Sequence, residues 1–426
     1  MVSFPFVTSA PGKVILFGEH SAVYNKPAIA AALSLRTYLL VSHDLEDETE
    51  IRLEFPDIQF SHSWKLADLP WHLTNNEPGV PLASDDLNPE LVNEITSLLT
   101  SITSPLHYAA AYCFLYLFVS LCPHNVQGGL SFSVRSTLPI GAGLGSSASI
   151  SVCLASGFAY LGGLIKEATI TSDSVIAKDS DDCAFIDAWS FMGEKCIHGN
   201  PSGIDNAVAA HGGAVMFQRM SNSMPSVRTS MRNFPKIDLL LTNTNTPRRT
   251  ATLVGNVARI ISDFPKTSGS ILEAMEAIAR EAYNLMLRPF LDDDTKLRLF
   301  ELVRLNHGLL VSLGVSHPNL ERIKLYCDEL NLGETKLTGA GGGGCAITLL
   351  HDNCDTGRLN QLKEKFQSKG FETFETFLGG KGCALLVNPD EDLISKLTVE
   401  SFVGFKSRDE IEQTLGCSFR EEWRYW

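Results

Sequence analysis

The sequence predicts an α+β protein of two domains. Its 426 residues exceed the roughly 100–200 residues of an ordinary domain, so a single hydrophobic core is not expected. Strand-like and helix-like patterns follow one another in the order strand–helix–helix–strand with several antiparallel hairpins, which is not the regular alternation of a doubly wound parallel sheet. Three glycine-rich stretches separate these elements.

The first third is predicted to consist of strands and turns. β-Branched and aromatic residues at 14–17, 37–43 and 51–56 indicate three strands. The acidic residues at 44–50 predict a solvated turn between the last two. Residues 61–104 are polar and without a clear pattern, so we expect irregular structure there, including a surface excursion along "NNEPGVPLASDDLNPE".

The middle of the chain is predicted to alternate helices and strands. Residues 106–122 carry no formal charge, but they are fewer than the ~20 residues of a membrane span and include His107, which favours a buried helix. A strand at 129–139 and a helix at 147–160 follow, on either side of the first glycine-rich stretch. Residues 184–198 predict a further helix.

A domain boundary is predicted near residue 230, between two further strands. Strands are predicted at 212–218 and 236–244, and the polar residues 219–235 between them mark the boundary, which divides the chain into 1–230 and 231–426. The last segments of the second part are expected to be able to pack back on the first.

Beyond the boundary, helical patterns continue to about residue 330. The third glycine-rich stretch then leads into a strand near 345–350. A helix at 359–370 and a strand–turn–strand at 371–387 follow. The aromatic and charged tail, 419–426, suggests no function.

Composition excludes several classes of protein. A net charge of −14 argues against a nucleic-acid coat, although local basic residues can still line a cleft. The ten cysteines lack Cys-x-x-Cys spacing, which indicates buried thiols in a reducing compartment and not a zinc site. The N-terminus shows no secretory signal, so we expect a cytoplasmic protein.

The first glycine-rich stretch, "PIGAGLGSSASIS" at 139–151, is a candidate anion site. It follows a predicted strand and opens a helix, whose first N–H groups are unpaired and carry partial positive charge. The stretch lacks the lysine of a Walker A loop, and Ser146 stands where a Rossmann fingerprint has its third glycine. A phosphate site and a structural turn both remain open.

The other two stretches could complete a phosphoryl-transfer site. Glu194 and Asp205 lie on either side of glycine and proline residues that end a helix, so they could converge, one to hold Mg²⁺ and one to orient or deprotonate a hydroxyl. Surface charges or helix caps are the alternative. The four glycines at 341–344 suit a ligand lying against the backbone, or else a flexible turn.

Together with "APGKVILFGEHSAVYNKPAIAAAL" at 10–33, these stretches resemble the galactokinase, homoserine kinase, mevalonate kinase and phosphomevalonate kinase superfamily. The resemblance extends from Pro11 to about Leu386. It is closest to the mevalonate kinases, in particular to eukaryotic members of fungal type. The deciding stretches are "GEHSAVYNKPA" and "IHGNPSGIDNAV", because galactokinases share only the "GEH" head.

The resemblance implies a fold, a reaction and a set of partners. The fold is a ribosomal-S5-like α/β domain followed by a ferredoxin-like α+β domain, with the active site in the cleft between them. The reaction is ATP- and Mg²⁺-dependent phosphorylation of (R)-mevalonate to 5-phosphomevalonate, in isoprenoid and sterol biosynthesis. Related enzymes are commonly homodimers, and prenyl diphosphates inhibit some of them at the ATP site.

The resemblance also implies residue roles. It assigns ATP to the first glycine loop and its neighbours, namely Lys13, Ser136, Gly141, Ala142, Gly143, Leu144, Gly145, Ser146 and Ser147. It assigns Mg²⁺ to Ser147 and Glu194. It assigns the catalytic base to Asp205, with Lys13 beside it to offset developing negative charge. It assigns the substrate to Glu19, His20, Thr244 and Ala340.

One position departs from the family pattern. Asn245 stands where the family often carries a basic residue, so another group would hold the mevalonate carboxylate. Arg248, Arg249 and Lys13 are the candidates.

Three alternatives to a mevalonate kinase are considered. The first is a related kinase acting on a sugar or on phosphomevalonate. The second is a sensor that binds ATP and a metabolite without transfer, which need not keep the magnesium and base positions Ser147, Glu194 and Asp205. The third is a structural protein whose glycine loops are turns.

Overall fold

The computed structural model describes residues 2–74, 86–175, 180–220, 226–232, 234–247, 249–288 and 290–426. Most of the expected surface excursion at 75–90, as well as Arg248, lies outside this range. The described strands are β1 (Phe6–Phe17), β2 (Ala28–His43), β3 (Glu50–Phe55), β4 (Phe60–Lys65), β5 (Leu130–Ser136), β6 (Ala214–Gln218), β7 (Val227–Met231), β8 (Ile237–Asn243), β9 (Gly333–Leu337), β10 (Cys345–Leu350), β11 (Glu372–Leu378), β12 (Ala384–Leu386) and β13 (Trp423–Tyr425).

The described helices are α1 (Pro89–Leu98), α2 (Pro105–Leu121), α3 (Ser146–Leu161), α4 (Asp181–His198), α5 (Ile204–His211), α6 (Thr250–Asp263), α7 (Pro265–Met286), α8 (Asp293–Ser312), α9 (Pro318–Glu329), α10 (Thr356–Gln367), α11 (Glu391–Lys396), α12 (Val399–Gly404) and α13 (Arg408–Leu415). Short 3₁₀ helices lie at Ser21–Tyr24, Pro56–Ile58, Leu66–Asp68 and Trp71–Leu73.

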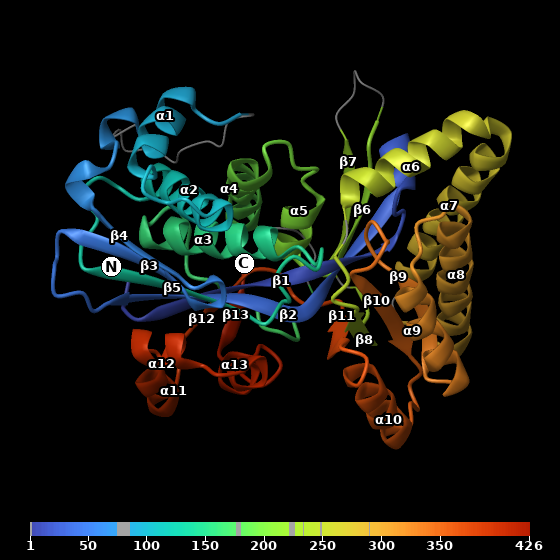
Figure 1. Ribbon diagram of the computed structural model, residues 1–426. Coiled ribbons are helices and arrows are strands. Elements are labelled where there is room, and N and C mark those ends of the chain that lie inside the picture. Colours follow the sequence, from blue (N-terminus) through green and yellow to red (C-terminus); the bar gives the residue numbers. More distant parts are fainter. Residues whose placement is uncertain are drawn as a thin grey trace.

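A branched sheet runs through the whole molecule (Figure 1). Its main path has the order β13-β12-β1-β2-β11-β8-β10-β9. The 16-residue strand β2 connects the two halves, because it pairs with β1, β5 and β6 and meets β11 where Leu33 lies opposite Leu378. The ends of β1 and β2 therefore carry the head motif to the junction between the halves.

Helices α2, α3 and α4 cover one face of the sheet in the first half (Figure 1). Their core includes a cluster of phenylalanine rings in edge-to-face contact, Phe114, Phe132 and Phe158 among them, with centroids 5.3–5.4 Å apart. The helix expected at 106–122 is α2, and it is largely buried. Among the described residues no helix is both long and apolar enough to cross a membrane.

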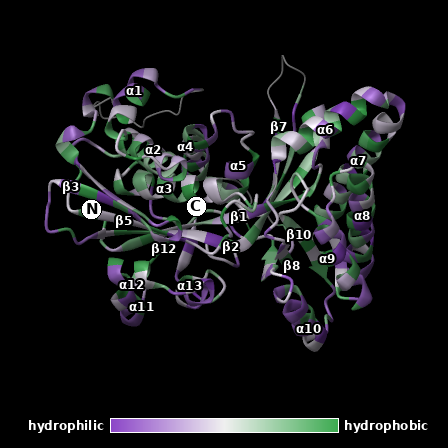
Figure 2. Ribbon diagram, in the orientation of Figure 1, coloured by the Kyte–Doolittle hydropathy of each residue, from purple (hydrophilic) through white to green (hydrophobic). Residues whose placement is uncertain are grey.

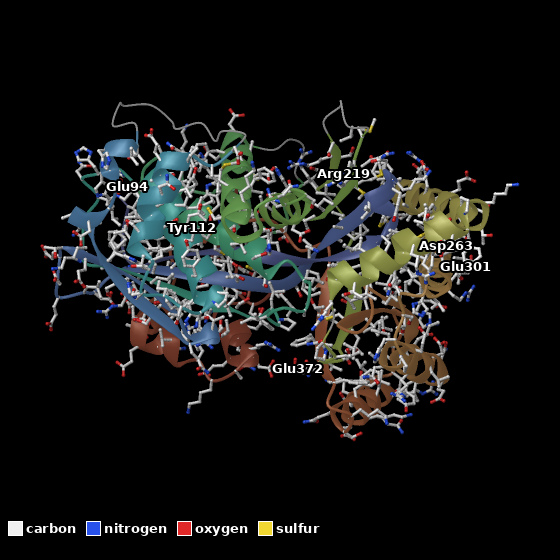
Figure 3. All side chains as sticks on the ribbon, turned by 45° about the horizontal axis from the view of Figure 1, so that its top comes forward. Glu94, Tyr112, Arg219, Asp263, Glu301 and Glu372 are labelled. Atoms are coloured by element: carbon white, nitrogen blue, oxygen red, sulfur yellow. The ribbon has the colours of Figure 1, made fainter. Side chains whose placement is uncertain are left out.

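Helices α6 to α9 form the second half together with strands β8 to β10 (Figure 1). Hydrophobic residues line the inner sides of these helices, whereas their outer surfaces are polar (Figure 2). Acidic residues such as Glu94, Asp263 and Glu372 are exposed and lie at separate places on the molecule (Figure 3). The negative charge is thus spread over the outside of the protein.

One local prediction was wrong. The region 61–104 holds β4 and α1, and α1 begins at a Pro after the Asn88 cap and buries Leu91 and Ile95 one turn apart. The polar segment 219–235 contains β7, which pairs with β6.

The two strands predicted at 371–387 are present as β11 and β12, but they do not pair with each other. β11 pairs with β8, and β12 pairs with β1 and β13. Residues from Ala384 onward thus lie beside the first half, and the tail ends in β13, where Trp423 is buried. The division at residue 230 remains a prediction.

Candidate functional site

Lys13 and Asp205 form an ion pair at the centre of the site. Lys13 lies in β1 and Asp205 in the first turn of α5, and Lys13 Nζ is 3.1 Å from Asp205 Oδ2. Lys13 is buried, whereas about a third of the Asp205 side chain is exposed. The carboxylate can therefore meet a ligand while the ammonium group is held behind it.

The first glycine loop lies against the same lysine. Lys13 Nζ donates to the Gly143 carbonyl at 3.4 Å, and its backbone N–H donates to Leu144 O at 2.8 Å. Gly145 has a φ of 72°, and a Cβ there would lie 2.9 Å from Lys13 Cγ, so only glycine fits this close approach without a shift of the lysine.

Helix α3 starts directly after this loop, at Ser146. Its cap residue is a glycine, and no side chain accepts a hydrogen bond from the first N–H groups. These donors, the helix dipole and Lys13 together form a positively polarised region that suits an oxyanion. The prediction of an anion site at this loop is consistent with this geometry.

Glu194 is a buried carboxylate beside the glycine loop. Its Oε1 atom has no hydrogen-bond partner. Burial, with the nearby Asp205 charge adding to it, raises the pKa of Glu194 to about 7, although Ser147 and Lys13 oppose the shift. Ser147 Oγ also lies 3.0 Å from His198 Nε2, one turn further along α4.

These residues fit a magnesium ion. A buried carboxylate with an unpartnered oxygen and a raised pKa lacks a positive partner, and Mg²⁺ prefers carboxylate and hydroxyl oxygens. The described residues contain no group of three acidic, histidine or cysteine ligands. Glu194 and Ser147 would therefore hold the ion only together with oxygens of a bound nucleotide.

An apolar cavity adjoins the loop. Its lining includes Ile140, Ile150 and Ile197, together with the predicted ATP contacts Ser136, Ser146 and Ser147. Ser136 Oγ lies 3.0 Å from Thr37 Oγ1 and accepts a hydrogen bond from the Leu138 N–H, which fixes the entry to the loop. The cavity thus lies beside the start of α3.

The third glycine stretch faces the head motif. His20 Nε2 lies 2.9 Å from the Ala340 carbonyl, and Thr338 Oγ1 donates to Ile15 O at 2.9 Å. Thr244 donates to Gly344 O from both its backbone N–H and its hydroxyl. His20, Ala340 and Thr244 are therefore brought to one junction, although they are distant in sequence.

Glu19 differs from its neighbour His20 because its carboxylate points away from solvent. Lys336 Nζ forms an ion pair with Oε1, and Asn306 Nδ2 donates to Oε2 at 3.2 Å. The side chains of Glu19 and Lys336 have no exposed surface. Burial lowers the pKa of Lys336, and Glu19 opposes that shift.

Sequence reasoning missed Lys336 and Asn306. The only signal in the sequence was a lysine inside the strand that precedes the third glycine stretch. It also missed Asp187, which accepts from Asn206 Nδ2 at 2.6 Å and lies 3.4 Å from His211 Nε2. Asp187 thereby contacts both ends of the helix that carries Asp205.

Lys13, Arg248 and Arg249 remain the three candidates to bind an anionic group of the substrate. Asn245 is exposed, and its amide donates to Gly370 O at 3.1 Å. Arg249 is exposed just before α6. Arg248 lies outside the described residues.

Comparison with known proteins places this geometry in a family. The family model for the GHMP kinases N terminal domain matches residues 107–213, and that for the GHMP kinases C terminal matches residues 295–372. The chain is 51% identical to the mevalonate kinase of Candida albicans over the full length of both proteins. It is 46% identical to that of Saccharomyces cerevisiae (97% of each chain) and 35% identical to that of Homo sapiens (90% of this chain and 96% of the relative).

Solved structures share the fold. A crystal structure of L. major mevalonate kinase in complex with R-mevalonate superposes with a TM-score of 0.62 at 20% identity, covering 89% of this chain and 97% of that one. The Methanococcus jannaschii mevalonate kinase gives 0.61 at 23% identity, covering 88% and 98%. The predicted α+β kinase fold is thereby confirmed.

Proposed function

The chain belongs to the mevalonate kinase family of the GHMP kinases, and on this premise we propose that it transfers the γ-phosphoryl group of ATP to (R)-mevalonate, giving 5-phosphomevalonate and ADP. The observation that carries the proposal is the Lys13–Asp205 pair at the mouth of the glycine loop. In this pair, Asp205 is the base for the alcohol, and Lys13 is the cation beside the loop that we propose binds phosphate.

Asp205 accepts, or at least orients, the proton of the attacking hydroxyl. Its side chain is about one third exposed, while its ion pair with Lys13 holds the carboxylate in place. Lys13 offsets the negative charge that develops on the acceptor oxygen and on the transferred group. Positioning and charge compensation supply most of the catalysis in phosphoryl transfer, and these two groups contribute to both.

The loop from Gly141 to Ser147 binds the triphosphate. The backbone N–H groups at the start of α3 donate to phosphate oxygens, and Lys13 contributes the side-chain charge. Glu194 and Ser147 would hold Mg²⁺, which would supply positive charge to offset that of the triphosphate. Ser136 contacts the nucleotide from the cavity wall.

Mevalonate occupies the junction on the other side of Asp205. His20, Ala340 and Thr244 line it, and Glu19 belongs to the same head motif. The carboxylate of mevalonate pairs with Arg248, Arg249 or Lys13. The neutral Asn245 cannot supply that charge.

The apolar cavity supports two further parts of the proposal. It accommodates the adenine base, and the same apolar lining would accept the chain of a prenyl diphosphate whose diphosphate occupies the loop. Farnesyl diphosphate should then raise the apparent KM for ATP and leave kcat unchanged. An unchanged KM for ATP would remove this regulation from the proposal.

The oligomeric state, the location and the pathway of the enzyme are inferred from its family. We infer a homodimer that acts in the cytoplasm on the route to sterols. Sedimentation of the purified protein at micromolar concentration tests the first point, and a monomer at that concentration would contradict it. Fractionation of cells that express the tagged chain tests the second.

One assay tests the proposed reaction. Purified protein with Mg-ATP is offered mevalonate, galactose, homoserine and phosphomevalonate in separate reactions while ADP release is followed. We expect ADP only with mevalonate, and mass spectrometry should identify 5-phosphomevalonate. ADP with another alcohol would indicate a related kinase, and ATP binding without any ADP release would indicate a sensor.

A further inference from the structure

Glu19 belongs to the head motif, yet no ligand can reach its carboxylate in this structure. Both oxygens are engaged, one by Lys336 and the other by Asn306, and neither Glu19 nor Lys336 exposes any side-chain surface. A second donor from Lys336 Nζ goes to the Leu337 carbonyl at 2.8 Å. The pair is therefore a closed buried ion pair and not an open binding group.

The pair is one of three contacts that join two distant segments. Lys336 lies at the end of β9, and Thr338 and Ala340 follow it where the chain leaves the strand and turns at Gly339. Their partners all lie within residues 15–20: Lys336 contacts Glu19, Thr338 contacts Ile15, and Ala340 contacts His20. The ion pair is the only charged contact of the three, and its lysine lies in β9, just before the glycine stretch.

We propose that Glu19 and Lys336 are positioning residues, whose buried ion pair sets the spacing between the head motif and the 339–344 glycine stretch. This inference rests on the proposed function, because that spacing defines the site where His20 and Ala340 face the alcohol substrate. Glu19 acts on mevalonate through this spacing and does not touch it. Lys336 and Asn306 thereby join the residues that determine activity.

The chemistry of a buried ion pair makes the proposal testable. Removal of one partner leaves the other as an uncompensated buried charge, whereas replacement of both by neutral residues of similar size removes the charge problem altogether. A residue that binds substrate directly behaves differently, because its loss is not repaired by any change at Lys336.

The test compares wild type with Glu19→Gln, Lys336→Met and the variant that carries both substitutions. kcat and KM for mevalonate and for ATP are measured well below the melting temperature. We expect Glu19→Gln to lower kcat/KM for mevalonate about tenfold to a hundredfold, while KM for ATP stays within about threefold of wild type. The doubly substituted enzyme should recover at least tenfold over Glu19→Gln.

Two results overturn the proposal. Wild-type constants in Glu19→Gln would mean that the pair does not position the site. A doubly substituted enzyme no better than Glu19→Gln would make Glu19 a direct ligand. If Glu19→Gln does not fold, Lys336→Met replaces it in the comparison, because it leaves the Glu19 carboxylate uncompensated. It should lower kcat/KM for mevalonate, and the doubly substituted enzyme should recover at least tenfold over it; no recovery would overturn the proposal.

The exposed pair of Lys363 and Glu375 provides the control. Lys363→Met and Glu375→Gln, alone and together, should leave all constants within about twofold of wild type. The wild-type assay with the four alcohols separates a failure of the proposed reaction from a failure of this inference. If another alcohol is the substrate, the same comparison is made with that alcohol.

Discussion

Glu19 and Glu194 are both buried glutamates at the edge of one site, but their surroundings differ. Both oxygens of Glu19 have partners, and the nearest charge is the ammonium group of Lys336. Glu194 has an oxygen without a partner, and burial together with Asp205 raises its pKa to about 7. Burial alone therefore does not distinguish structural from ligand-binding carboxylates, whereas the presence of a compensating cation does.

The largest expected effect comes from substitution of Asp205, whose charge lies near Glu194. Asp205→Asn should fold and still bind ATP but lower kcat about 10²- to 10⁴-fold, because the amide cannot accept the proton of the hydroxyl. Steady-state kinetics with mevalonate measure the loss. The exposed Asp238 on β8 is the matched control, and Asp238→Asn should be as active as wild type. Wild-type turnover in Asp205→Asn would remove this residue from the mechanism.

The second effect is a pH dependence of stability. The pKa of Glu194 is raised from 4.5 to about 7 in the folded protein, so folding takes up a proton between these values. Without Mg²⁺, the stability that the raised pKa of Glu194 contributes is fully present below about pH 4.5. It is lost as the pH rises through 7, and the free energy of unfolding falls by about 3 kcal/mol.

Urea unfolding of Mg²⁺-free protein measures this contribution. Relative to Glu194→Gln, wild type should lose about 3 kcal/mol of unfolding free energy between pH 4.5 and 7. A constant difference between the two proteins over this range would contradict the raised pKa.

The third effect concerns magnesium. Glu194→Gln should raise the free Mg²⁺ needed for half-maximal activity about a hundredfold, as expected for loss of one charged contact of roughly 2–3 kcal/mol. Binding of Mn²⁺ with ATP, followed by electron paramagnetic resonance, should weaken in parallel. The requirement should be unchanged in Glu19→Gln. Equal shifts in the two variants would mean that the two glutamates do not differ in the way described.

The smallest effect tests the contacts around Glu19. Thr338→Val removes the hydrogen bond to Ile15 O and should cost about 1 kcal/mol of stability. Thermal unfolding measures the change, and the magnesium requirement should not move. A shift in that requirement would show that the two regions are coupled.

Sequence patterns predicted the elements whose signals are local. The apolar residues of α2 and the glycines and proline between α4 and α5 indicated those elements near their observed bounds. The pairing of β11 with β8, and of β12 with β1, was not predictable, because strand partners are chosen by contacts distant in sequence. Helix α1 was missed because its few apolar residues lie next to a polar, proline-rich segment.

The candidate site shows the same division. The resemblance named Lys13, Ser147, Glu194 and Asp205, and the structure brings these four together. It could not name Lys336 or Asn306, whose importance comes only from the buried carboxylate that they enclose. Nothing in the spacing of those residues signals that contact.

The sequence by itself determined the family and the chemical groups at the site, because motifs specify residue types at short range. Only the tertiary structure decided which buried carboxylate has a positive partner and which lacks one. That distinction depends on residues more than 280 positions apart in the case of Glu19 and Asn306. The energy of a buried charge is set by whatever lies within a few ångströms of it, and folding alone determines those neighbours.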